Sequence, residues 1–190
     1  MSNPTSLIEE MAAAARGTVA LLMGDRRAPS HFDFSARGLA GSAIAFLATV
    51  LLNAVLPHML GAAEATPSVA YSVLLTLLLY GLQIGCSALV LRQLNRLDGL
   101  LPYLVADNWF TFFAALLSTA VALLGISADV ALVAMMVLLL VVEINIARLI
   151  VTLAPRHVAL FIVAQLVGVS IGFLVLISMM PTPPGLTPPA

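Results

Sequence analysis

Five apolar runs, each long enough to cross a lipid bilayer as a helix, dominate this chain from residue 38 onward. A membrane-spanning helix needs about 20 mainly apolar residues. The runs are residues 38–57, 69–91, 101–124, 130–154 and 158–180. With 62% hydrophobic and 9% charged residues, the chain has too little polar surface to enclose a water-soluble core of this size. We therefore predict an all-α, polytopic membrane protein with five transmembrane helices.

The links between these runs are short, which predicts one bundle over residues 38–180 with no appended soluble domain. Short links leave consecutive helices as antiparallel neighbours. The links are residues 58–68, 92–100, 125–129 and 155–157. We therefore expect each span to pack beside the next one in the chain.

Residues 1–37 form a different kind of segment, which we predict to be cytoplasmic or interfacial. Ser6 and Glu9 have the spacing of a capping box at a helix start. Apolar residues then recur every three or four positions, which indicates an amphipathic helix ending near Gly24. These positions are Leu7, Ile8, Met11, Ala15, Val19 and Leu22. The helix either lies on the inner leaflet or packs on the cytoplasmic ends of the bundle.

The basic residues predict the orientation of the chain. All eight are arginines, and the first link, the third link and the tail contain none of them. They are Arg16, Arg26, Arg27, Arg37, Arg92, Arg96, Arg148 and Arg156. The excess of basic residues on cytoplasmic loops predicts that the N-terminus is inside and the C-terminus outside. Residues 181–190 are rich in proline and are expected to form an extended outer tail.

Polar side chains inside the spans are the candidate functional residues, because such groups are costly in lipid. They are Asp107, Asn108, Glu143, Asn145, Arg148, Gln83 and Gln165. Counted from the predicted inner ends of their helices, Asp107 and Arg148 both lie about 9 Å deep, which predicts an ion pair. Glu143 lies about 16 Å deep and needs another partner, such as an amide.

Glu143 has two interpretations. In the first, it exchanges a proton or binds a cation during transport. In the second, Asp107 and Arg148 form a structural latch and Glu143 stays neutral, hydrogen-bonded to an amide. Neither proline nor glycine interrupts the third or fourth helix. Because transporters usually contain broken helices, this continuity favours the structural interpretation.

Two pairs of glycines four residues apart indicate close helix packing. Gly81 and Gly85 lie in the second run, and Gly168 and Gly172 lie in the fifth. Small residues at this spacing let two backbones approach closely. We expect contacts inside the bundle at both pairs, with a dimer face as the alternative. In the third run, Tyr103 is expected near the membrane interface, whereas Trp109 is deep enough to pack inside.

The chain lacks the usual signs of catalysis or cofactor binding. It has a single cysteine, Cys86, and neither a zinc motif nor a nucleophile or phosphate-loop motif. The net charge of −1 argues against a nucleic-acid partner. We therefore expect a non-enzymatic protein without a cofactor, whose partners are the lipid bilayer and a second membrane protein or another copy of the chain.

One resemblance goes beyond composition. The stretch Phe32-Asp33-Phe34-Ser35, continued by Gly38 and Ser42, and the later pair Asn108-Trp109 resemble a group of small, uncharacterised bacterial membrane proteins. Members have an FD-x-S-x-x-G-x-x-x-S entry to the first helix and an NW pair in a middle helix. The resemblance covers most of the chain, implies the bacterial inner membrane and brings no activity. A cytoplasmic segment followed by five spans is also similar in architecture to the Yip1 family of membrane-trafficking proteins.

Two functions follow as hypotheses. The first is an accessory subunit, scaffold or membrane-organising factor that acts through helix or lipid contacts. The second is a small transporter or channel, acting as a single chain or as an oligomer, with Glu143 as the group that responds to protons or cations.

Overall fold

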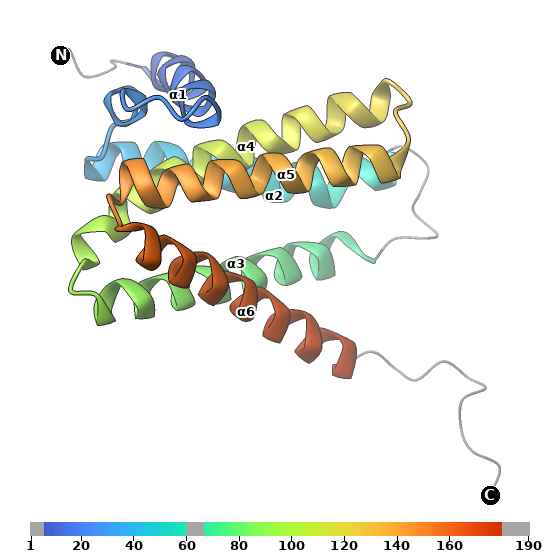
Figure 1. Ribbon diagram of the computed structural model, residues 1–190. Helices are drawn as coiled ribbons and strands as arrows, with labels where there is room; N and C mark the ends of the chain where they lie inside the picture. The colour runs from blue at the N-terminus through green and yellow to red at the C-terminus, as the bar shows by residue number, and fades with distance from the viewer. Residues whose placement is uncertain (1–5, 60–66, 180–190) are drawn as a thin grey trace, which may run out of the picture.

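The computed structural model describes residues 6–59 and 67–179, and these residues form a bundle of helices with no strands (Figure 1). The α-helices are α1 (Leu7–Leu22), α2 (Ala36–Met59), α3 (Val69–Gln93), α4 (Leu100–Leu123), α5 (Ala128–Asn145) and α6 (Pro155–Met179). Within the described ranges, five segments are long and apolar enough to cross a membrane, and they begin at α2. The predicted fold class is therefore confirmed. The predicted Pro-rich tail, residues 181–190, lies outside the described residues.

The fourth span ends differently from the prediction. Instead of one helix over residues 130–154, α5 stops at Asn145 and a π-helical turn follows at Ile146–Ile150. Thr152 then has a φ of 58°, and α6 begins at Pro155. Proline suits the first turn of a helix, where its missing N–H would have no partner anyway. The predicted link at residues 155–157 is therefore part of α6.

The helices do not pair in chain order. The most extensive packing joins α3 with α6 and α2 with α4, whereas consecutive α3 and α4 touch little, as do α5 and α6. In Figure 1, α2, α4 and α5 lie side by side, while α6 crosses α3 and diverges from the others towards its C-terminal end. The expectation that each span packs beside the next one holds for α2 with α3 and for α4 with α5, but not for the other two consecutive pairs, because matching faces, not link length, decide these contacts.

The α3–α6 contact shows such matching. A Cβ added to Gly168 would lie 2.7 Å from the Sγ of Cys86, and one added to Gly172 would lie 2.5 Å from Leu79. This pair makes the predicted internal contact. Gly81 and Gly85 do not, because nothing lies within 4 Å of a Cβ at either position. The internal contact predicted for that pair is wrong, and this face of α3 is open.

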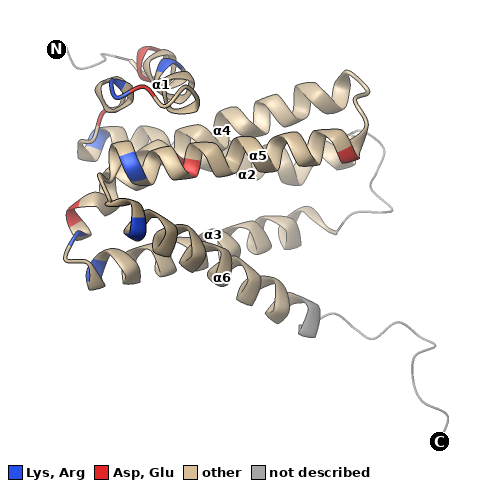
Figure 2. Cartoon of the chain, in the orientation of Figure 1, with Lys and Arg blue, Asp and Glu red and all other residues tan. Residues whose placement is uncertain are grey.

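All eight arginines gather at one end of the bundle, which we call the arginine end (Figure 2). Here Arg96 connects two links. Its guanidinium donates to the carbonyl oxygen of Val151 at 2.7 Å and to the hydroxyl of Thr152 at 2.9 Å. It also forms an ion pair with Asp98 at 3.4 Å. Arg96 thus fastens the α3–α4 link to the chain just after the π-helical turn.

Helix α1 lies across the spans near the arginine end (Figure 1). Ser6 and Glu9 form the predicted capping box, and the helix ends just before Gly24, whose φ is 66°. The buried side of α1 is not the apolar stripe but the neighbouring, mostly small side: Glu10, Ala14, Gly17, Thr18 and Leu21. Leu7, Ile8 and Val19 are exposed. The helix therefore packs on the bundle with one face, which agrees with the second predicted placement, and leaves an apolar face exposed.

The Phe-Asp-Phe-Ser segment connects α1 to α2. Ser35 caps α2, because its hydroxyl accepts from the Gly38 N–H at 3.3 Å, and its own N–H donates to Asp33 at 3.0 Å. Phe32 is buried against Gly17 of α1. A Cβ at Gly38 would lie 1.8 Å from the Asp33 carbonyl oxygen. The glycine of this motif is therefore required for the chain to turn back on the start of α2.

Candidate functional site

Two carboxyl side chains meet inside the spans. Asp107 of α4 is 3% exposed and lies beside Glu143 of α5, which is partly buried. One oxygen of each carboxyl is buried and reached by no donor of the described residues. A hydrogen bond between two carboxyl groups requires a proton on one of them. The two neighbouring groups can therefore share a proton when one of them is protonated.

The end of the fourth span explains why Asp107 meets Glu143 and not Arg148. Asp107 follows the start of α4 at Leu100 by seven residues, and Glu143 precedes the end of the π-helical turn at Ile150 by seven. Both therefore lie about 10 Å from the helix ends. The predicted depth of about 16 Å for Glu143 assumed a helix that continues to residue 154.

The predicted Asp107–Arg148 ion pair is wrong. Arg148 lies on the π-helical turn and is exposed, whereas Asp107 is buried. Among residues 6–59 and 67–179, the ion pair closer than 4.0 Å is Arg96–Asp98. No structural latch between α4 and α5 neutralises the carboxyl pair.

Amide and phenol groups from α3, α4 and α6 surround the pair. Gln165 is a hydrogen-bonding neighbour of Glu143 and donates to the hydroxyl oxygens of Ser87 and Tyr103, both at 3.1 Å. Gln83 also donates to the Tyr103 hydroxyl at 3.1 Å. Tyr103, which was predicted near the membrane interface, is 0% exposed and packs among the other helices. Its hydroxyl instead joins α3 and α6 to α4.

Asn108 extends the network to α2. The Tyr80 hydroxyl of α3 donates to the Asn108 side-chain oxygen, and the Asn108 amide donates to the Ser42 hydroxyl at 3.1 Å. The Ser42 hydroxyl in turn donates a hydrogen bond to the Leu39 carbonyl oxygen at 3.0 Å. All five spans thus contribute at least one polar side chain to the carboxyl pair or to the two hydrogen-bonded groups near it.

Asn145 takes part in a contact between α5 and α1, away from the carboxyl pair. Its amide donates to the Leu21 carbonyl oxygen at 2.8 Å, which holds the C-terminal end of α1 on α5. Nearer the other end of α1, Glu10 is 5% exposed and has the Trp109 side chain as a neighbour. Burial raises the pKa of the Glu10 carboxyl above its usual value, and the nearby Asp33 carboxylate raises it further. The Trp109 side chain and the Arg37 guanidinium act in the opposite direction and lower it. Trp109 is buried, as predicted.

Sequence reasoning identified Asp107, Glu143, Asn108, Gln83 and Gln165 as candidates, but missed the hydroxyl groups that join them. One sequence feature could have indicated these hydroxyl groups. Tyr80, Gln83 and Ser87 follow one another by three and four residues, which places them on one face of a helix. A polar stripe within an apolar span indicates a face turned away from lipid.

Comparison with known proteins adds no assignment: no protein family, curated protein or solved structure matches the chain.

Proposed function

We propose that this integral membrane protein takes up and releases a proton at the Asp107–Glu143 pair, as a small transporter or channel does. The observation that carries the proposal is a carboxyl pair within the spans, with Asp107 buried and Glu143 partly buried, that has no basic partner among the described residues. Ionisable groups inside membranes commonly mark ion pathways and proton relays. The Asp107–Arg148 ion pair on which the structural interpretation relied does not form among the described residues.

The π-helical turn supports the same proposal. The continuity of the fourth helix argued against transport in the sequence, but the α-helical pattern changes at Ile146, three residues after Glu143. π-turns inside or at the end of α-helices are frequent at functional sites. This turn gives α5 a point at which its geometry can change next to the carboxyl pair.

The test is proton movement by the full chain in liposomes. Purified protein is reconstituted with a pH-sensitive dye inside, and the outside is acidified. The proposal predicts faster internal acidification than in protein-free liposomes. Equal acidification rates in liposomes with and without the protein, at every imposed pH difference and membrane potential, would contradict a proton channel. The proposal would then require a substrate that is transported together with the proton.

The open glycine face of α3 favours a second candidate, an accessory subunit or scaffold that docks a helix of another membrane protein. Gly81 and Gly85 allow close backbone approach, yet no described residue occupies this face. This candidate and the first are compatible, and neither assigns a catalytic reaction. Both place the chain in the bacterial inner membrane with its N-terminus in the cytoplasm, which the arrangement of the arginines supports.

Replacing both Gly81 and Gly85 by leucine is expected to leave the chain folded but to remove a partner or a second copy that cross-links to wild type in native membranes. The added side chains meet open space in the isolated chain. The matched control is Gly168→Leu, which places a side chain against Cys86 and is expected to destabilise the fold by about 3 kcal/mol. Unchanged cross-links in the double variant would exclude this face as the docking site.

A further inference from the structure

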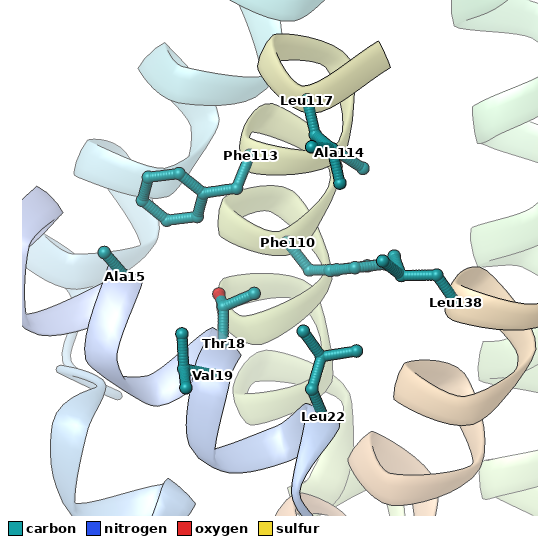
Figure 3. A pocket seen from close by; sticks show the side chains of 9 residues that line it. All are labelled: Ala15, Thr18, Val19, Leu22, Phe110, Phe113, Ala114, Leu117 and Leu138. Carbon is teal, nitrogen blue, oxygen red and sulfur yellow. The ribbon is translucent and has the colours of Figure 1, made fainter. Parts of the chain in front are cut away.

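A groove of about 240 Å³ lies between α1, α4 and α5, on the side of the bundle that faces lipid. Figure 3 shows it enclosed by side chains of Ala15 and Leu22 from α1, of Phe110 and Phe113 from α4, and of Leu138 from α5. At its rim, Val19 and Leu117 are exposed. The groove is therefore almost wholly apolar and opens onto the surface that the bilayer covers.

One polar atom interrupts this lining. Thr18 is 7% exposed, and its hydroxyl has no hydrogen-bond partner among the described residues. Figure 3 shows its side chain pointing into the space that the other lining residues surround. Five other helical hydroxyls donate to a carbonyl oxygen three or four residues earlier, namely those of Ser42, Thr49, Thr76, Ser87 and Thr119.

A buried donor without an acceptor costs about 1–3 kcal/mol, so the Thr18 hydroxyl favours an occupant with an acceptor oxygen. The apolar walls require that the rest of this occupant be a hydrocarbon chain. An acyl chain with its ester carbonyl has both features. The groove runs from Thr18 on α1 towards Leu117 of α4, away from the arginine end. That direction places the ester near α1 and the chain deeper in the bilayer.

The arginines on and after α1 favour a lipid with an anionic headgroup. Arg16 is exposed on α1 two residues before Thr18, and Arg26 and Arg27 follow the end of this helix and are exposed. Basic side chains next to a membrane surface attract anionic lipids by about 1 kcal/mol each. We propose that the groove binds one acyl chain of an anionic phospholipid, with the Thr18 hydroxyl donating to the ester carbonyl and the arginines facing the headgroup.

The inference is independent of the proton site and is tested by lipid binding. The full chain is purified in mild detergent, depleted of lipid and titrated with phosphatidylglycerol or with phosphatidylcholine of the same chains, and bound lipid is counted by native mass spectrometry. We expect one tightly bound phosphatidylglycerol and weaker binding of phosphatidylcholine. Equal affinity for the two lipids would overturn the role of the arginines.

Two variants test the groove itself. Thr18→Val keeps the shape and removes the donor, so it is expected to weaken phosphatidylglycerol binding about threefold to tenfold, the value of one hydrogen bond. Ala15→Phe fills the groove and is expected to abolish the tight site. Thr119→Val, whose hydroxyl donates to the Ala115 carbonyl oxygen at 2.9 Å, is the control and should bind as wild type does.

Circular dichroism and thermal melting establish that the variants fold. Retention of one tight phosphatidylglycerol by folded Ala15→Phe would overturn the proposal. A protein dimer that is lost in Ala15→Phe, with no lipid bound to wild type, would overturn it as well, because a second copy would then occupy the groove.

Discussion

Replacing Glu143 by glutamine is expected to reduce proton movement into liposomes to the protein-free level while leaving the chain folded. Glutamine keeps the shape of the side chain and its contact with Gln165 but cannot exchange a proton at physiological pH. Asp107→Asn is expected to act in the same way, because the pair needs both carboxyl groups to pass one proton between them. The measurement is the acidification rate at matched protein content.

Asp129→Asn is the matched control for these variants. Asp129 is exposed in the first turn of α5, at the opposite end of the helix from Glu143. Its substitution removes a carboxylate without touching the buried pair and should leave the rate unchanged. Wild-type rates in folded Glu143→Gln would contradict the proposed role of Glu143 and favour a purely structural carboxyl.

Replacing Gly38 by alanine is expected to cause the largest loss of stability among single-methyl additions to this chain. The new Cβ would lie 1.8 Å from the Asp33 carbonyl oxygen, and a backbone atom cannot move aside as a flexible side chain does. The turn that carries Phe32 to its place against α1 would have to open. We expect a loss of about 3 kcal/mol or more, measured by denaturant unfolding in detergent.

Gly81→Ala is the control for that measurement. It adds the same methyl group to a helix where nothing lies within 4 Å, and alanine favours a helix over glycine by about 1 kcal/mol. Its stability should equal or exceed that of wild type. If Gly38→Ala and Gly81→Ala unfold at the same denaturant concentration, the close approach at Gly38 does not contribute to stability.

The five spans and the capped N-terminal helix could be predicted because they depend on local features. Apolar length defines each span, and Ser6 with Glu9 defines the start of α1. Which helices pair could not be predicted, because link length says nothing about the faces that match. Gly168 and Gly172 contact α3, while Gly81 and Gly85 have the same spacing but no described residue within 4 Å of a Cβ at either position.

The contact between Asp107 and Glu143 was not predicted because the depth of each residue was counted from an assumed helix end. An apolar run that continues to residue 154 predicts a helix of that length, and no proline or glycine warns of the π-helical turn at Ile146–Ile150. The predicted helix end was four residues too late, which is about 6 Å along the helix axis. The prediction therefore placed Arg148, and not Glu143, at the depth of Asp107. The face of α1 that is buried was missed for a different reason. Small residues allow close packing although they are not the most apolar.

The most direct test of the central claim is infrared difference spectroscopy of the protein in bilayers across a pH titration. The account predicts a protonated-carboxyl band that titrates in wild type and disappears in both Asp107→Asn and Glu143→Gln. It should persist in Glu10→Gln, since Glu10 is also buried but lies outside the pair. A band that titrates identically in wild type and in both pair variants would show that Asp107 and Glu143 hold no exchangeable proton, and would contradict the account.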